Sequence, residues 1–283
     1  MADTAQQNTR LPRRFHNTFK PERQYIHAML RFAAAQKSGT YQEIRDETGI
    51  PMGKSSGKVS AILDYSRGMG LIHLAGDVRS AVKRPELTPF GRVVLFEDPH
   101  LKEAITQWIA HFNLCGPLIG ADVWYYVFFQ GSQRLGVRFS REKLDEYLRL
   151  TYKKEDTNLI GPLVGMYEDS AAFSLCGALS EIEGVISQEP APIIEELGFA
   201  YGAWVLQQMS NHFPPNTQIT VTELDAKAGW RSIPGWDATS VKRVLELMER
   251  KGILDVDRHM NPWILRPMVP VDDIWQRIYD DLI

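Results

Sequence analysis

Residues 40–72 read TYQEIRDETGIPMGKSSGKVSAILDYSRGMGLI. Residues 220–254 repeat this pattern with two more residues in the middle: TVTELDAKAGWRSIPGWDATSVKRVLELMERKGIL. Each stretch has a Thr-x-x-Glu step, an apolar residue, a glycine, apolar residues at helical spacing and a second glycine before an apolar pair. Two copies are a stronger signal than one, because chance must produce both. We therefore base the predicted fold on this repeat.

The local signals in each copy predict a helix, a turn, a second helix and a strand. Thr40 and Glu43 form a capping box, because the threonine hydroxyl can accept the Glu43 N–H while the glutamate reaches back. That helix is expected to end at Gly49, and the second helix to cover about residues 55–67. A strand at 71–74 would follow it. This order is typical of a winged helix-turn-helix.

We therefore predict a mainly α-helical protein in which two winged helix-turn-helix units flank a helical middle domain. The expected divisions are a basic flexible arm at 1–20, an N-terminal winged helix at 21–98, a helical middle domain at 99–213 and a C-terminal winged helix at 214–283. Apolar residues at three- and four-residue intervals predict the helices of the middle domain at 99–113, 118–130, 140–153, 156–166, 169–187 and 190–212.

Positive charge is concentrated near the N-terminus, although the whole chain has a net charge of only −3. Residues 1–90 hold 14 lysines and arginines against 8 aspartates and glutamates, whereas residues 91–213 hold 9 against 16. Residues 214–283 hold 9 against 11. The net charge argues against a protein that coats DNA. The asymmetry places a phosphate-binding surface in the N-terminal part.

The N-terminal unit carries the main candidates for DNA contact. At the start of its second helix, small hydroxyl side chains and lysines suit phosphates and base edges: Lys54, Ser55, Ser56, Lys58 and Ser60. The predicted wing and arm add basic side chains for flanking phosphates: Arg79, Lys83 and Arg84 in the wing, and Arg13 and Arg14 in the arm. A winged helix that binds protein instead of DNA is the alternative interpretation.

The C-terminal unit has a weaker charge pattern. Its second helix would begin after Asp237, a good N-cap residue, and would expose Lys242 and Arg243 as candidate DNA contacts. Asp255 and Asp257 lie in its predicted wing, where carboxylates repel phosphate. DNA contact and a structural or dimerising role are both open for this copy.

Nothing in the sequence favours an enzyme, a metal site or a bound cofactor. The seven histidines are scattered, and no serine, cysteine or carboxylate lies in a catalytic motif. Cys115 and Cys176 lack metal or redox spacing, and the polar start is unlike a signal peptide, so we expect a cytoplasmic protein. The most apolar run, 114–130, is interrupted by Pro117 and Asp122, so no membrane span is expected.

Several short motifs resemble those of a bacterial family of unknown function, the domain of unknown function four-thousand-and-seven. They are Phe15-His16-Asn17-Thr18-Phe19, Leu87-Thr88-Pro89-Phe90-Gly91, Glu97-Asp98-Pro99-His100-Leu101, Trp108-Ile109-Ala110-His111, Trp124-Tyr125-Tyr126 and Phe139-Ser140-Arg141-Glu142-Lys143-Leu144. In the first motif, Asn17 replaces the family's glutamate. Members are often encoded beside DNA phosphorothioation genes and sulfate-reductase-like enzymes. The resemblance therefore implies a setting in DNA modification or phage defence.

Together these observations predict a DNA-binding accessory protein of a bacterial DNA-modification or antiviral defence system. Duplex DNA would bind the N-terminal winged helix, and a protein partner, such as a sulfate-reductase-like or other modification enzyme, would bind the acidic remainder. Two alternatives are open: a dimeric transcription regulator, and a protein–protein adaptor that does not touch DNA. The first of these requires a homodimer, a state on which the sequence is silent.

Overall fold

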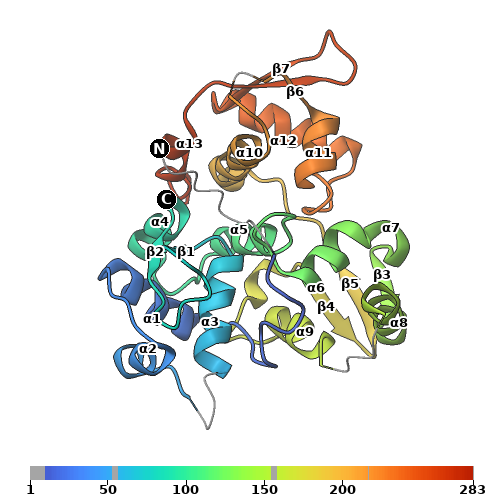
Figure 1. The fold of residues 1–283 in the computed structure, drawn as a ribbon. Coiled ribbons are helices and arrows are strands. Elements are labelled where there is room, and N and C mark those ends of the chain that lie inside the picture. The colour runs from blue at the N-terminus through green and yellow to red at the C-terminus, as the bar shows by residue number, and fades with distance from the viewer. Residues whose placement is uncertain (1–9, 53–56, 154–157, 216, 283) are drawn as a thin grey trace.

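The computed structural model describes residues 10–52, 57–153, 158–215 and 217–282. Over these residues the chain is mainly helical, as predicted, and also contains three small antiparallel sheets. Figure 1 shows three groups of elements: the N-terminal group in blue to cyan, the middle group in green to yellow, and the C-terminal group in orange to red above both. No helix in this part of the chain is both long and apolar enough to cross a membrane.

The N-terminal group consists of three helices, a hairpin and a fourth helix. These are α1 (Arg23–Ala34), α2 (Tyr41–Thr48), α3 (Gly57–Gly68), β1 (Ile72–Leu74), β2 (Pro85–Leu87) and α4 (Pro89–Glu97). The predicted capping box begins α2: the Glu43 N–H donates to Thr40 Oγ1 at 3.4 Å, and the Thr40 N–H donates to Glu43 Oε2 at 2.7 Å. Gly49 ends α2 with φ +70°, a conformation that glycine adopts without strain. Both predictions are confirmed.

The C-terminal group repeats this order of elements. It consists of α10 (Gly198–His212), β6 (Ile219–Thr220), α11 (Val221–Ala228), α12 (Ala238–Arg250), β7 (Leu254–Asp257), β8 (Ile264–Pro267) and α13 (Val271–Trp275). Thr220 and Glu223 form the second capping box. The predicted N-cap of α12 is also confirmed, since the Asp237 carboxylate accepts the Ser240 N–H at 2.7 Å.

The likeness between the two groups extends beyond the repeat seen in the sequence. In the C-terminal group, β6 pairs with β8 just before α11 begins. In the N-terminal group, Gly39 forms an antiparallel bridge with Lys83 just before α2 begins. A preceding helix also packs in the same way, α1 against α2 and α3, and α10 against α11 and α12. The boundary predicted at 213 therefore separates α10 from the helices on which it packs.

The middle group is not purely helical. Its elements are α5 (Ala104–Leu114), α6 (Asp122–Trp124), the π-helix η1 (Tyr125–Gln130), α7 (Ser132–Leu135), β3 (Arg138–Ser140), α8 (Arg141–Tyr152), α9 (Ile160–Glu168), the 3₁₀ turn η2 (Ser174–Cys176), β4 (Leu179–Ile182), β5 (Val185–Gln188) and the 3₁₀ turn η3 (Glu195–Leu197). The strands form one sheet in the order β3-β5-β4.

The helix predicted at 169–187 is wrong, because this segment contains the β4–β5 hairpin. Glu183 and Gly184 form its two-residue turn with φ +50° and +75°. Positive φ at both central residues matches the twist of antiparallel strands, so the turn favours a hairpin over a continued helix. The helix predicted at 190–212 is also too long. Its α-helical part begins at Gly198, after Pro190 and Pro192.

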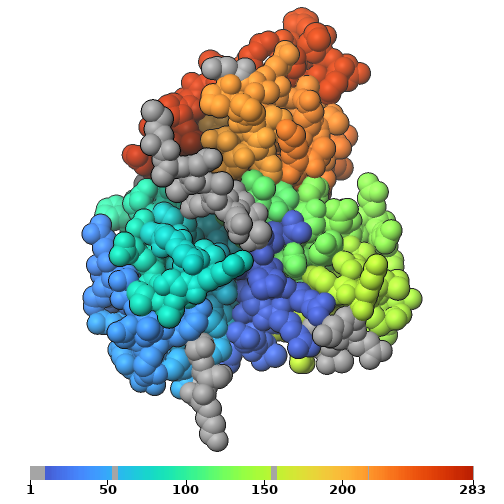
Figure 2. All heavy atoms as spheres, in the orientation of Figure 1, coloured from blue at the N-terminus to red at the C-terminus, as the bar shows by residue number. Residues whose placement is uncertain are grey.

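The flexible arm predicted at 1–20 is wrong for its described part, 10–20. Leu11 is buried and forms a parallel bridge with Ala121. Arg10 Nε lies 3.0 Å from Asp122 Oδ1, and its guanidinium lies 3.9 Å from the centre of the Tyr125 ring. Figure 2 shows this dark blue segment on the surface between the N-terminal and middle groups. The segment is docked because these contacts join it to the start of α6 and η1.

A buried hydrogen-bonded chain lies in the core beside this segment. Trp124 Nε1 donates to Tyr167 Oη at 3.0 Å, and Tyr167 Oη lies 2.7 Å from His111 Nδ1. Burial lowers the pKa of His111 to about 3, which keeps the imidazole neutral at neutral pH. Tyr167 Oη thus accepts a hydrogen bond from Trp124 and shares a second one with His111 Nδ1, whose direction depends on the imidazole tautomer. The chain is thereby satisfied without charge.

The end of the chain joins the C-terminal group to the rest. α13 packs against α10 and α4, and the ring centres of Trp275 and Phe90 are 5.1 Å apart. The Tyr279 hydroxyl lies 2.6 Å from Thr106 Oγ1 in α5. The two repeated groups are thus connected through α4, α5 and α13.

Candidate nucleic-acid interface

The loop between β1 and β2, residues 75–84, is held from the inside by Lys83. The side chain of Lys83 is buried, and its Nζ donates to the carbonyl oxygens of Val78 at 2.7 Å and Ser80 at 2.6 Å. Lys83 was a predicted phosphate contact, but here its ammonium organises the loop. Its place in the fold explains this, since its backbone forms the bridge to Gly39.

Two other cations of the same loop face the solvent. Arg79 and Arg84 are exposed, and no carboxylate of the described residues lies within ion-pair distance of either guanidinium. The backbone places them firmly: the Asp77 carboxylate accepts the Arg79 N–H at 2.8 Å, and the Arg84 carbonyl accepts the Ala75 N–H at 2.9 Å. The loop therefore presents two guanidinium groups that can bind phosphate.

The predicted contacts at the start of α3 have mixed outcomes. Lys54, Ser55 and Ser56 lie outside the described residues. The Nζ of Lys58 lies 2.7 Å from Glu22 Oε1 and 4.3 Å from the centre of the Tyr25 ring. The side chain of Lys58 is only 15% exposed, so its charge is neutralised within the protein.

Ser60 and the motif at residues 15–19 form hydrogen bonds within the protein. Ser60 Oγ donates to the Gly57 carbonyl at 3.1 Å and accepts from Asn17 Nδ2 at 3.3 Å. His16 is buried, and its Nδ1 accepts the Thr18 N–H at 3.0 Å. The motif therefore anchors residues 15–19 to α3.

The predicted arm contacts lie beside the middle group. The Arg13 guanidinium lies 5.0 Å from the centre of the Tyr152 ring, a cation–π arrangement. Arg14 is exposed. DNA contact by these two residues stays a prediction.

In the C-terminal counterpart, the candidate cations contact other groups of the protein. Lys242 lies 3.9 Å from Glu246, and Arg243 donates to the Ile193 carbonyl at 3.4 Å. In the hairpin, two arginines pair with nearby carboxylates: Arg258 with Glu249 at 2.6 Å, and Arg266 with Asp255 at 3.2 Å and Asp257 at 2.6 Å. Hydrogen bonding to Arg258 lowers the pKa of Glu249. The two hairpins thus have the same order of elements but differ in whether their exposed arginines are ion-paired.

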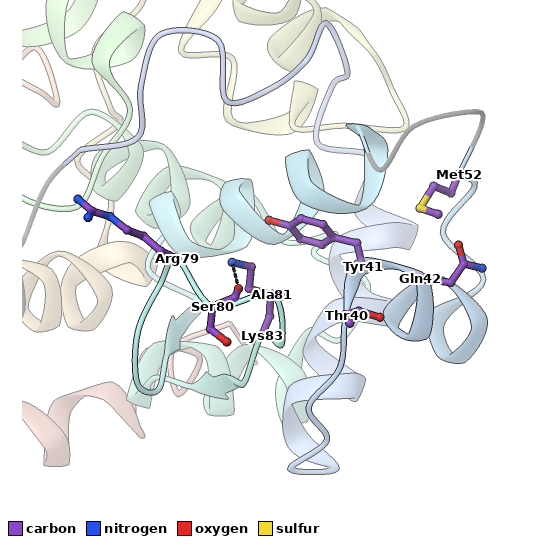
Figure 3. Close-up of a pocket in the computed structure, with 8 residues that line it drawn as sticks. All are labelled: Thr40, Tyr41, Gln42, Met52, Arg79, Ser80, Ala81 and Lys83. Atoms are coloured by element: carbon purple, nitrogen blue, oxygen red, sulfur yellow. Dashed lines mark hydrogen bonds between the residues drawn. The ribbon is translucent and has the colours of Figure 1, made fainter.

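A cavity of about 480 Å³ lies between the start of α2 and the N-terminal hairpin loop. Its lining residues are Thr40, Tyr41, Gln42, Met52, Arg79, Ser80, Ala81 and Lys83. Figure 3 shows the Tyr41 ring between the loop residues and Met52, with the Arg79 guanidinium directed away from Tyr41. Burial raises the pKa of Tyr41, so its ring stays neutral. Tyr41 was not among the predicted contacts, because its position beside a capping box indicates a helix start and nothing more.

This surface combines a cationic side chain with a largely apolar cavity. The exposed side chain of Arg79 lines the cavity together with an aromatic ring and a thioether. Among the described residues, no three histidine, cysteine, aspartate or glutamate side chains are arranged to hold a metal ion.

Two solved structures share the fold of this chain. One is described as a magnesium ion-bound SspB crystal structure; it is 16% identical, with a TM-score of 0.68, over 95% of this chain and 88% of that chain. The other is described as an SspB crystal structure; it is 17% identical, with a TM-score of 0.64, over the same shares of the two chains. At such identities the likeness concerns the fold alone.

The search among curated proteins finds no match. A family model described as a protein of unknown function (DUF4007) matches residues 14–161, which is more than half of the chain. The protein therefore belongs to the DUF4007 family.

Proposed function

We propose that the protein binds duplex DNA through its N-terminal group, acting as a winged helix, in a bacterial DNA-modification or phage-defence system of the phosphorothioation type. The observation that carries this proposal is the difference between the two hairpins. Arg79 and Arg84 have no carboxylate partner among the described residues, whereas Arg258 and Arg266 are ion-paired. An unpaired guanidinium can bind a phosphate without first giving up a carboxylate.

In this proposal the hairpin loop holds the phosphate backbone while the start of α3 enters the major groove. This is the docking geometry of winged and other helix-turn-helix proteins, in which the N-terminal residues of the second helix of the motif contact base edges. Lys54, Ser55 and Ser56 are the side chains proposed for that role. Arg79 and Arg84 would position the protein without reading sequence.

The C-terminal group is proposed to bind a protein partner. The two arginines of its hairpin are already paired with carboxylates, which makes a phosphate a poor competitor for them. An alternating set of paired charges of this kind suits the polar rim of a protein interface. The partner implied by the family resemblance is a modification or defence enzyme.

The DNA part of the proposal is tested with the Arg79→Ala/Arg84→Ala double variant. Fluorescence anisotropy with a labelled duplex would measure Kd between 50 and 200 mM salt. Each lost phosphate contact lowers the slope of log K against log salt by about 0.9, so two contacts lower it by about 1.8. Over that fourfold range of salt, the binding constant of the native protein should fall about twelvefold more than that of the variant.

The matched control is the Arg138→Ala/Arg149→Ala double variant, which removes the same charge. Both arginines are exposed and lack an ion-pair partner among the described residues. They lie in β3 and α8, on the opposite side of Figure 1 from β1 and β2. Equal losses of affinity in both double variants, or no loss in either, would overturn DNA binding by the hairpin.

The partner part is tested by a pull-down with and without nuclease. A partner recruited by protein contacts should remain bound after nuclease treatment, because DNA does not bridge the two proteins. Loss of every partner on nuclease treatment would contradict recruitment.

A further inference from the structure

The cavity beside the hairpin loop is not explained by phosphate binding alone. Its volume of about 480 Å³ is within the range of small-molecule sites. It opens between two elements of the proposed DNA-binding surface, α2 and the loop 75–84. A ligand in this cavity would therefore lie within the DNA-binding surface.

The walls of the cavity suit a flat aromatic ligand. Tyr41 contributes a phenol ring, and Met52 contributes a polarizable thioether near it. The Lys83 Nζ lies 5.6 Å from the centre of the Tyr41 ring and is bonded to two loop carbonyls. These bonds fix the loop wall, so the space is formed before a ligand arrives.

The charges around the cavity suit a ligand that carries phosphate outside the pocket. The Arg79 guanidinium lies at the edge and is directed away from Tyr41. A base that stacks on Tyr41 would therefore leave its backbone phosphate on the side of Arg79. Gln42 adds an exposed amide, whose oxygen accepts from the Arg45 guanidinium and whose NH2 group can donate to a base edge.

We infer that this cavity binds one unstacked nucleobase of the bound DNA, with Tyr41 as the stacking platform and Arg79 at the adjoining phosphate. This inference rests on the proposed DNA-binding function and adds a ligand class to it. Leaving the duplex costs least for a base that has no pairing partner. The protein should therefore prefer a duplex with one bulged base over the same duplex fully paired.

The test compares Kd for two labelled duplexes that differ only in one bulged adenine. Stacking of one base on an aromatic ring corresponds to roughly a 5- to 150-fold change in affinity. Tyr41→Leu should lose the preference for the bulged duplex and keep the affinity for the paired one. Tyr41→Phe retains the ring and should keep both, and it is the matched control.

A second variant covers the case in which Tyr41→Leu does not fold. Ala81 is exposed and lines the cavity, so Ala81→Leu fills part of the space without removing Tyr41 and without adding a ring on which a base could stack. It should abolish the preference for the bulged duplex. A native protein with no such preference, or a preference that survives both variants, would overturn the inference.

Two further outcomes have distinct meanings. If Arg79→Ala/Arg84→Ala leaves the paired duplex bound as before, the proposed function fails irrespective of the bulge result. Free deoxyadenosine monophosphate offers the same base and phosphate from another source. In one outcome, the protein binds this free nucleotide saturably, loses that binding in Tyr41→Leu and shows no preference for the bulged duplex. That combination of results would assign the cavity to a free nucleotide and overturn the DNA assignment.

Discussion

The buried chain from Trp124 through Tyr167 to His111 predicts a specific dependence of stability on pH. The pKa of His111 is about 3 in the folded protein, because burial penalises its charged form. In the unfolded chain its ordinary value is 6.5. The unfolded state therefore binds an extra proton between these two values. The contribution of the neutral His111 to the free energy of unfolding is fully present above pH 6.5 and is lost progressively as the pH falls toward 3.

The size of the effect follows from the two pKa values. Between pH 7 and pH 5, His111 should reduce the free energy of unfolding by about 2 kcal/mol. His111→Gln removes the titrating ring and should abolish that share of the loss. Urea unfolding at both pH values, followed by tryptophan fluorescence, would measure it. Other groups titrate equally in both proteins, so only the difference between them counts.

His259→Gln is the matched control, because it removes an exposed imidazole. It should leave the difference in stability between pH 7 and pH 5 close to that of the native protein. If His111→Gln and the native protein lose the same free energy between the two pH values, the buried neutral histidine does not act as described.

Three other perturbations have clear expected outcomes. Lys83→Met should weaken binding to paired DNA without lowering the salt slope measured by anisotropy, because the Lys83 ammonium is bonded within the loop. A slope lowered by about 0.9 would instead identify Lys83 as a phosphate contact. Asp225→Ala should lower the free energy of unfolding in urea by about 3 kcal/mol, since the buried Asp225 carboxylate accepts hydrogen bonds from Arg231 and Ser232. A decrease below about 1 kcal/mol would argue against this network. Gly91→Ala should greatly reduce the yield of folded protein, measured with circular dichroism, because a Cβ at this position would collide with the Leu71 carbonyl. A native-like spectrum and yield would contradict that collision.

The parts of the fold that the sequence predicted depend on short-range chemistry. Thr40 and Glu43 need only each other to form a capping box, and Gly49 needs only its own backbone freedom. In the sheet β3-β5-β4, by contrast, β3 pairs with β5 across more than forty residues. No local pattern at 138–140 indicates that partner, so β3 was not predicted.

In the candidate interface, too, local features could be predicted from the sequence and tertiary contacts could not. The sequence identified basic side chains in the hairpin loop but could not tell which of them would face solvent. Lys83 is buried because its backbone pairs with Gly39, and Lys58 is paired because α3 brings it to Glu22. Arg79 and Arg84 remain exposed. A charge count therefore locates a basic segment, whereas the surface charge depends on tertiary partners.

The strand order β3-β5-β4 has a consequence for any attempt to express the family region by itself. The family match covers 14–161 and includes β3, but both partners of that sheet lie beyond it, at Leu179–Ile182 and Val185–Gln188. A fragment cut at 161 would leave β3 as an unpaired edge and uncover Phe139, which is buried in the full chain. Such a fragment is expected to aggregate, and a soluble excised piece should extend at least through β5.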